Sequence, residues 1–372
     1  MTRLLAGDMI VRLLGAQAFD TDAVVEAVHA ACGWLPEPAQ KALAESGLEG
    51  LADAVLLEGQ FGSDHFALPP LLRLYYRMRP LLPGAARALL RRTVVSRTGG
   101  SGLLRWPVED RFVSFVEQVR AVLEESLSSM RVLPWWPSGH SFAVVLTHDV
   151  EGPFGLSHLQ DVLALERAAG FRSSVSFVGG TYTVPDSLLQ ELRGEGFEIA
   201  VHGWRHDGQL FSSRRLFNER LPKVNQQLRQ WDAVGFKSPM THRNPVWMQD
   251  LDVAWDSSFF DTDPFEPIPG GVMSIWPFVM GRFVELPCTL PQDHTLIETL
   301  GETSPRVWVE KVDYIADHHG MALVNTHPDY LCRTGRLVMY EEFLDGLAHR
   351  SGYWHALPRE VAAWTRVRWD GI

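Results

Sequence analysis

From Ser141 onward, short apolar runs alternate with longer amphipathic stretches. Short β-branched runs predict strands, whereas apolar residues spaced three and four apart predict helices buried on one face. The predicted strands are Phe142 to Thr147, Ser174 to Phe177, Glu198 to Val201, Val253 to Phe259, Val284 to Leu286 and Ala322 to Asn325. The predicted helices are Gly155 to Ala169, Pro185 to Arg193, Ser213 to Trp231, Pro305 to His318 and Tyr340 to Ala348. This alternation predicts a parallel α/β architecture, with a (β/α) barrel favoured.

The part of the chain before this alternation is mainly helical in its pattern. The predicted helices are Ala23 to Cys32, Pro38 to Ser46, Pro69 to Met78 and Arg111 to Leu127. Gly- and Pro-rich breaks separate them, and no cluster of catalytic side chains is evident there. We therefore predict a helical accessory domain over residues 1–133 and a barrel domain over residues 134–372.

Composition narrows the class of protein. Of the 372 residues, 46% are hydrophobic and 21% are charged, which is typical of a globular chain with a large core. The net charge of −11 argues against nucleic acid or an anionic membrane as the main partner. The three cysteines form no CxxC pair, and Asp8 interrupts the N-terminus before an apolar run reaches signal-peptide length. No run is long enough to span a bilayer, so we expect a cytoplasmic protein, with its oligomeric state open.

Metal-competent side chains follow two of the predicted strands. Asp149 and Glu151 come two residues apart at the end of the first, so both can face one site. His202 and His206 follow the third at a spacing of four, which suits one metal ion. Taken alone, each pair is more simply a solvated loop or an incidental pair. Together, a carboxylate and two imidazoles are a common ligand set of hydrolytic zinc sites.

Two further strand ends carry candidate catalytic residues. Arg243 lies in a Pro-containing turn, where its guanidinium can orient a catalytic carboxylate. His327 follows a buried apolar strand and stops at Pro328, a position that suits a general acid. A surface arginine and a hydrogen-bonded core histidine are the simpler interpretations of each residue alone.

The ordered set of motifs resembles the polysaccharide deacetylases, also called the NodB-homology family or carbohydrate esterase family 4. Thr147 to Glu151 occupies the place of the family's Thr-Phe-Asp-Asp-Gly motif, and His202 to His206 matches its His-Ser/Thr-x-x-His motif. Arg243 to Trp247 matches the Arg-x-Pro-x-Trp/Tyr motif, and Val324 to His327 approximates Leu-x-His. The resemblance spans roughly Ser141 to Arg366 and implies a distorted (β/α) barrel of the polysaccharide deacetylase type.

The resemblance also implies a function and residue roles. It implies a metal-dependent hydrolase that removes an N-acyl group, typically acetyl, from an amino sugar or its conjugate in polysaccharide or glycoconjugate biosynthesis. One divalent ion is expected, with zinc favoured, and cobalt or nickel also fit such ligands. The implied roles are metal binding by Glu151, His202 and His206, catalysis by Asp149 as base, His327 as acid and Arg243 as the partner of Asp149, and substrate binding by Trp204, Pro245 and Trp247.

Two departures from the family pattern leave alternatives open. Val150 stands where the family usually has its metal-binding Asp, so Glu151 is the local substitute, as in branches that carry Asp-x-Asp. His148 replaces the usual Phe and is expected either to pack in the core or to line the cleft. The Asp and nearby Trp that support the catalytic histidine in the family have the candidates Asp256, Asp261, Asp263 and Trp276. Separately, the segments Glu285 to Pro287 and Pro291 to His294 are interpreted either as site wall or as a strand end followed by a loop. A deformylase, an amidase on a non-sugar amide, and a metal-free carbohydrate-binding pseudoenzyme are the competing functions.

Overall fold

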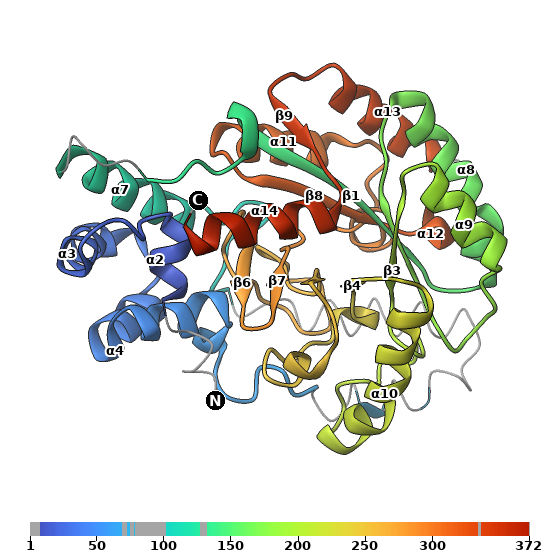
Figure 1. Cartoon of the computed structure of the whole chain (residues 1–372), viewed down its shortest axis with the longest axis horizontal. Helices are drawn as coiled ribbons and strands as arrows, with labels where there is room; N and C mark the ends of the chain where they lie inside the picture. Colours follow the sequence, from blue (N-terminus) through green and yellow to red (C-terminus); the bar gives the residue numbers. More distant parts are fainter. Residues whose placement is uncertain are drawn as a thin grey trace.

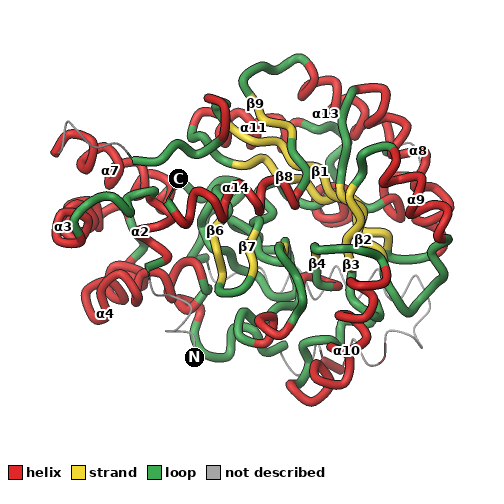
Figure 2. Tube along the Cα trace, viewed as in Figure 1, coloured by secondary structure: helices red, strands yellow, loops and turns green. Residues whose placement is uncertain are grey.

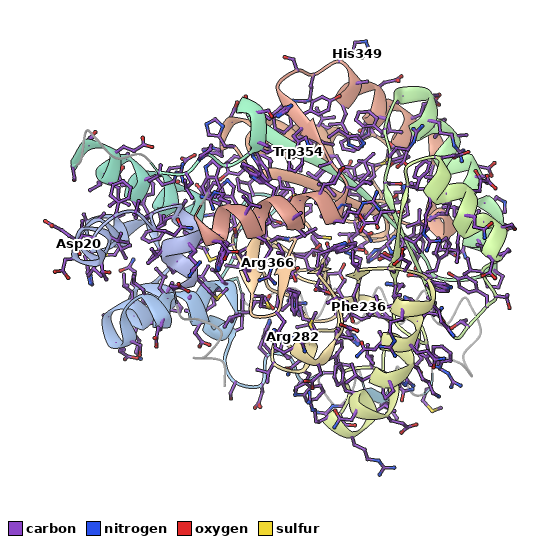
Figure 3. The ribbon with its side chains drawn as sticks, in the orientation of Figure 1. Asp20, Phe236, Arg282, His349, Trp354 and Arg366 are labelled. Carbon is purple, nitrogen blue, oxygen red and sulfur yellow. The ribbon has the colours of Figure 1, made fainter. Side chains whose placement is uncertain are left out.

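The computed structural model describes residues 8–68, 73, 74, 78, 102–126, 132–333 and 336–371. A curled sheet with helices outside it forms the larger part of the molecule, and a group of helices from the N-terminal part packs beside it (Figure 1). The buried hydrophobic side chains of both parts form one continuous cluster. Side chains fill the space between the layers, with Phe236 buried inside and Asp20 and His349 at the periphery (Figure 3).

The sheet has nine strands, all parallel to their neighbours except one pair. They are β1 (Phe142–Val150), β2 (Ser174–Phe177), β3 (Glu198–Val201), β4 (Gly235–Phe236), β5 (Trp255–Asp256), β6 (Phe278–Met280), β7 (Phe283–Glu285), β8 (Met321–Thr326) and β9 (Tyr353–His355). The order is β6-β7-β5-β4-β3-β2-β1-β8, with β6 and β7 antiparallel and β9 paired with β1. Among these described strands β6 and β8 are the two edges, so the sheet is an open barrel.

Helices cover the outside of this sheet (Figure 2). They are α8 (Pro153–Ala169), α9 (Asp186–Gly194), α10 (Arg214–Gln230), α11 (Arg306–Asp317), α12 (Pro328–Leu331), α13 (Leu337–Ala348) and α14 (Pro358–Asp370). Local signals set their ends. The Ser213 side chain accepts a hydrogen bond from the Leu216 N–H where α10 begins, and Gly170 in the left-handed conformation ends α8.

The predicted fold class and element order are confirmed, with differences in the short elements. All six predicted strands and all five predicted barrel helices are present. The predicted strand Val253 to Phe259 is reduced to β5, while β1 continues three residues further, to Val150. Strands β4, β6 and β9 and helices α12 and α14 were not predicted.

The N-terminal part is helical, as predicted. Its described helices are α2 (Met9–Leu14), α3 (Thr21–Ala31), α4 (Glu37–Leu56) and α7 (Arg111–Ser126), with the 3-10 turns η1 (Cys32–Trp34) and η2 (Gly59–Phe61). The predicted helix Pro69 to Met78 lies largely outside the described residues, as does Leu127. No described helix is both long and apolar enough to cross a membrane.

Contacts between the two parts are extensive. The Arg368 guanidinium of α14 donates to the carbonyl oxygens of Arg12 at 3.2 Å, Leu13 at 2.9 Å and Pro134 at 3.1 Å. Two of these bonds reach carbonyl oxygens in the last turn of α2, where a helix has more backbone acceptors than donors. The domain boundary at residues 133/134 stays a prediction, because the packing is continuous across it.

Candidate active site

The end of β1 presents alternate residues to opposite faces of the sheet, as its extended backbone requires. Thr147 and Asp149 face the interior, where Asn325 of β8 contacts both. Thr147 Oγ1 donates to Asn325 Oδ1 at 2.9 Å, and Asn325 Nδ2 donates to Asp149 Oδ2 at 3.0 Å. Val150 is fully buried on the other face. Asp149 and Glu151 therefore belong to the same side, as the spacing predicts.

Of the two positions expected for His148, the structure shows packing in the core. His148 is fully buried, its Nδ1 lies 2.7 Å from Thr326 Oγ1, and its Nε2 lies 2.7 Å from Glu166 Oε1 of α8. Both ring nitrogens are thus occupied on the face of β1 away from Asp149.

A turn after β1 holds Glu151 close to His206. The His206 Nε2 lies 3.3 Å from Glu151 Oε1. The backbone N–H of Glu151 donates to Asp329 Oδ2 at 3.0 Å, and that of Gly155 donates to Asp329 Oδ1 at 3.1 Å. A Cβ at Gly155 would come within 1.9 Å of Asp329 Oδ2, so only glycine permits this approach. Asp329 therefore fixes the backbone that carries Glu151.

One ring nitrogen of His202 makes a hydrogen bond, and the other has no hydrogen-bond partner among the described residues. Its Nδ1 donates to the Lys237 carbonyl at 3.0 Å, so the lone pair lies on Nε2. That Nε2 is buried and has no hydrogen-bond partner among the described residues, and the same holds for Asp149 Oδ1. Burial also lowers the pKa of His202, which favours its neutral, metal-binding form. The ring centroids of His202 and His206 are 5.1 Å apart. These buried, unpartnered atoms fit a metal ion bound beside them.

Asp149 is ionised despite its burial. Burial raises the pKa of a carboxyl, but the electrostatic interactions with His202, Lys237 and His327 and the hydrogen bond from Asn325 outweigh it, and the pKa of Asp149 lies below its usual value. Lys237 is itself fully buried, with its Nζ donating to the Ser257 carbonyl at 2.7 Å.

Arg243 is not the partner of Asp149, and this part of the prediction is wrong. Its Nε donates to Glu58 Oε2 at 2.7 Å and its Nη2 to Glu58 Oε1 at 2.5 Å. Its Nη1 donates to the carbonyls of Thr241 and Ile268. No hydrogen bond or ion pair joins the described side chains of Arg243 and Asp149. Glu58 comes from the helical N-terminal part, which the motif pattern could not connect with Arg243.

His327 is held by a carboxylate that the sequence did not single out. Its Nδ1 donates to Asp293 Oδ1 at 2.6 Å, and its backbone N–H donates to Asp293 Oδ2 at 2.8 Å. Burial would lower the pKa of His327, but the charge of Asp293 and this hydrogen bond raise it to about 9. The free Nε2 lies 3.8 Å from Asp149 Oδ2 and 3.9 Å from Glu151 Oε1. Asp293 lies in the segment interpreted as site wall.

The earlier candidates for this supporting carboxylate have other partners. Asp256 accepts from the backbone and hydroxyl of Ser258, and Asp261 lies 2.8 Å from Lys311 Nζ. Asp263 accepts from the Phe265 N–H at 2.7 Å. Trp276 donates its indole N–H to the His319 carbonyl. None of these four contacts His327.

Beside the group around His202 lies a second group of side chains that could hold a metal ion. Ligand atoms of Asp293, His294 and His327 all lie within 4.8 Å of one another. The Asp293 carboxylate, however, already accepts from His327 twice and from the His294 N–H at 2.7 Å. A carboxylate with three donors is better suited to orient His327 than to bind a cation. We therefore favour the group around His202.

The predicted substrate-binding residues are packed against their neighbours. The Trp247 ring lies 6.2 Å from that of Phe211 and 5.9 Å from that of Phe217. Trp204 packs on Gly180, where a Cβ would come within 2.5 Å of its ring. Pro245 is buried. Their contact with substrate stays a prediction.

Solved structures with a similar fold include two described as polysaccharide deacetylases. One, from Mycobacterium smegmatis, has a TM-score of 0.50 and 19% identity over 63% of this chain and 93% of its own. One from Pseudomonas aeruginosa has a TM-score of 0.51 and 15% identity over 63% and 94%. PuuE allantoinase has a TM-score of 0.51 and 14% identity over 64% and 95%. No protein-family model matches the sequence, and no curated protein matches it. The chain thus has the polysaccharide deacetylase fold, which an allantoinase shares.

Proposed function

We propose that this chain is a metal-dependent hydrolase that removes an N-acyl group, typically acetyl, from an amino sugar or its conjugate. The observation that carries the proposal is the convergence of buried, unpartnered His202 Nε2 and Asp149 Oδ1 with the Glu151–His206 pair and the His327–Asp293 pair. A base, an acid and a metal-competent group are the three components that amide hydrolysis requires.

Glu151, His202 and His206 would hold the metal ion, and two imidazoles with one carboxylate suit zinc. When bound, such an ion supplies Lewis-acid chemistry for the acyl carbonyl and the attacking water. The Lys237 carbonyl fixes the tautomer of His202, and Asp329 fixes the backbone of Glu151. The Lys237 carbonyl and the Asp329 carboxylate would thus orient the ligands, and hydrogen-bond partners of this kind normally raise the affinity of a site for its metal.

Asp149 and His327 divide the proton transfers. Asp149 is held ionised, so it can take a proton from the water that attacks the acyl carbon. His327 is held protonated by Asp293, and its Nε2 faces Asp149 and Glu151 across the site. It can therefore give a proton to the departing nitrogen, which an amine leaving group needs.

A second candidate function is an amidase on a substrate other than a sugar. This second candidate is supported by the fold that the chain shares with PuuE allantoinase, an enzyme named for allantoin and not for a polysaccharide. The motifs of residues 147–151, 202–206 and 243–247 favour the sugar. Half-buried Trp204 remains our candidate for stacking on a sugar ring.

We place the activity in polysaccharide or glycoconjugate biosynthesis in the cytoplasm, since all three cysteines are free thiols. The test is release of free amine by zinc-loaded protein from N-acetyl and N-formyl amino sugars, free and nucleotide-linked. Allantoin is assayed in parallel by the carboxylate that opening of its ring would form. Amine release from an amino sugar supports the proposal. Turnover of allantoin alone would support the amidase, and no turnover in metal-replete protein would oppose both.

A further inference from the structure

We infer that Glu58, from the helical N-terminal part, is a positioning residue for the candidate active site, acting through Arg243 and a buried hydrogen-bond chain that ends at Asp149. The inference rests on the proposed function, because it assigns Asp149 the role of base. It gives a positioning role to a part of the chain whose sequence shows no cluster of catalytic side chains.

The series begins at the ion pair between Glu58 and Arg243, which is fully buried and bidentate. Both oxygens of Glu58 accept from Arg243, and His65 Nε2 lies 3.5 Å from Glu58 Oε2. Gly270 packs so closely that a Cβ there would come within 2.9 Å of Glu58 Oε1. Burial alone would raise the pKa of Glu58, but Arg243 and His65 lower it to about 2. The pair is therefore charged and has no room to rearrange.

The backbone around this anchor is strained. Glu58 has a φ of 58°, and the consecutive residues Met240 and Thr241 have φ values of 59° and 52°. Left-handed conformations in residues other than glycine cost free energy and persist only where surrounding contacts enforce them. Here the Arg243 guanidinium, bonded to Glu58, also donates to the Thr241 carbonyl at 3.2 Å. The strained turn before Arg243 is thus held from the helical part.

From Thr241 the chain of hydrogen bonds leads into the barrel. Thr241 Oγ1 donates to Glu266 Oε2 at 2.8 Å, and Gln292 Nε2 donates to Glu266 Oε1 at 2.8 Å. Asn325 Nδ2 donates to Gln292 Oε1 at 2.8 Å and to Asp149 Oδ2 at 3.0 Å. Every side chain in this series is buried. Both N–H groups of the Asn325 amide are used, one toward Gln292 and one toward Asp149, so Asn325 cannot follow a shift of Gln292 without changing its bond to Asp149.

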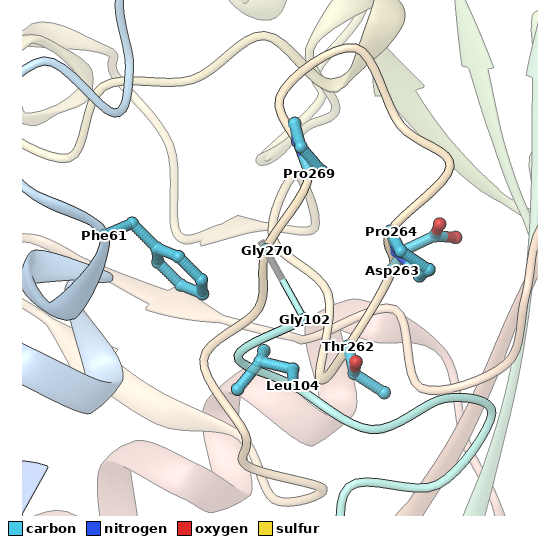
Figure 4. Close-up of a pocket in the computed structure, with 8 residues that line it drawn as sticks. All are labelled: Phe61, Gly102, Leu104, Thr262, Asp263, Pro264, Pro269 and Gly270. Atoms are coloured by element: carbon cyan, nitrogen blue, oxygen red, sulfur yellow. The ribbon is translucent and has the colours of Figure 1, made fainter. Parts of the chain in front are cut away.

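The two parts also meet directly at this place. A small pocket beside Gly270 is lined by Phe61 and Leu104 of the N-terminal part and by Thr262 to Pro264 and Pro269 of the barrel (Figure 4). The barrel loop between these lining residues carries Glu266. A displacement of η2 would therefore reach the loop through packing as well as through Glu58.

In a buried network a lost charge is poorly compensated by water, so the geometry at the far end changes. A misplacement of about 1 Å of a catalytic group can cost on the order of 100-fold in turnover. Glu58→Gln keeps the shape of the side chain and removes its charge. We expect it to lower kcat by at least about tenfold, with a much smaller change in KM and unchanged zinc content.

The matched control is Arg368→Gln in the full-length protein. Arg368 is also buried and also joins the two parts, but none of its hydrogen bonds belongs to the series that ends at Asp149. It should lower the midpoint of thermal unfolding and leave kcat of the folded fraction unchanged. If Glu58 acts through Arg243, then Glu58→Gln combined with Arg243→Gln should lose no more kcat than Arg243→Gln alone.

A readout independent of activity separates this inference from the proposed function. The imidazole NMR signals of His202 and His327 should shift in Glu58→Gln and not in Arg368→Gln. Wild-type protein without any hydrolase activity would refute the proposed function, and these signals would still decide the positioning role. Unchanged kcat or unchanged imidazole signals in Glu58→Gln would overturn the inference. If Glu58→Gln does not fold, Gly270→Ala takes its place, because its added Cβ would lie 2.9 Å from Glu58 Oε1. Its kcat and its imidazole signals of His202 and His327 are then measured, and no change in either would overturn the inference.

Discussion

His202 Nε2 and Asp149 Oδ1 are buried polar atoms with no hydrogen-bond partner among the described residues. Leaving such an atom unsatisfied typically costs about 1–3 kcal/mol. Two such atoms beside the Glu151–His206 pair are explained if a cation and a water use them when bound. A pseudoenzyme without metal would gain stability by filling the same space with apolar side chains.

His202→Ala should remove metal binding without unfolding the chain. Loss of groups that merely support a ligand costs about 10–100-fold in metal affinity, so loss of the ligand itself should cost at least about 100-fold. Competition with a zinc chelator measures this, and His349→Ala, which changes an exposed histidine, is the control. Equal zinc affinity in His202→Ala and wild type would place the metal elsewhere, with the Asp293–His294–His327 group as the next candidate.

His327→Ala should affect substrates according to their leaving group. Loss of a general acid typically costs about 100-fold or more for an amide, whose amine must be protonated. An activated ester, whose leaving group needs no proton, should lose far less. The measurement is kcat on an N-acetyl amino sugar and on an activated acetyl ester. Equal losses on both would show that His327 does not serve as the acid.

Local pattern in the sequence was enough to select five residues that the structure brings together. Asp149 lies at the end of β1, while Glu151, His202, His206 and His327 come within five residues after a strand, and these five meet in the structure. Their supporting groups could not be predicted in the same way. Asp293 lies 34 residues from His327, and Glu58 lies 185 residues from Arg243. Only the tertiary fold determines which acidic residue faces which cation.

At the scale of elements, the turn from β1 into α8 is built around Asp329. This carboxylate, which follows β8, binds the backbone N–H groups of Glu151 and Gly155. Two neighbouring parallel strands thereby fix the backbone of Glu151, one of the proposed metal ligands. The same contact leaves no space for a side chain at the third position of α8.

Gly155→Ala should therefore weaken metal binding from outside the ligand set. The added Cβ would lie 1.9 Å from Asp329 Oδ2, so Asp329 must move and release the backbone of Glu151. We expect a loss of roughly 1–3 kcal/mol in unfolding free energy from overpacking and a lower zinc affinity. Gly346→Ala in α13, which meets no atom within 4 Å, is the control. Unaltered zinc affinity in Gly155→Ala would mean that Asp329 does not support Glu151.

Long periodic elements were predicted well and the shortest were not. Helix α10 carries its apolar face over 17 residues, whereas β4 has two residues and β6 three. Strands of this length exist because neighbouring strands hold them in register, and too few residues remain to show a periodic pattern. Strand β9 is only half-buried and pairs with the first three residues of β1.

For the whole molecule, the Glu58–Arg243 pair makes the helical part and the barrel interdependent. The pKa of Glu58 is lowered to about 2 from its usual 4.5, so the pair's contribution to stability is complete above pH 4.5 and is lost as the pH falls toward 2. Glu58→Gln should lower the unfolding free energy at neutral pH by roughly 3 kcal/mol. The difference from wild type should shrink as the pH falls through this window. Urea unfolding of both proteins between pH 7 and pH 3 checks it, and a constant difference would contradict a charged pair.

The central claim is that Asp149 is the base of a metal-dependent N-deacylase, and one comparison tests it most directly. Zinc-loaded wild type and Asp149→Asn are compared for amine release from an N-acetyl amino sugar, with the zinc content of each sample measured. Asp149 is not among the proposed ligands, so the variant should keep its zinc and lose nearly all turnover, about 100-fold or more. The account would be contradicted if Asp149→Asn turned over substrate near the wild-type rate, or if the purified variant contained no zinc.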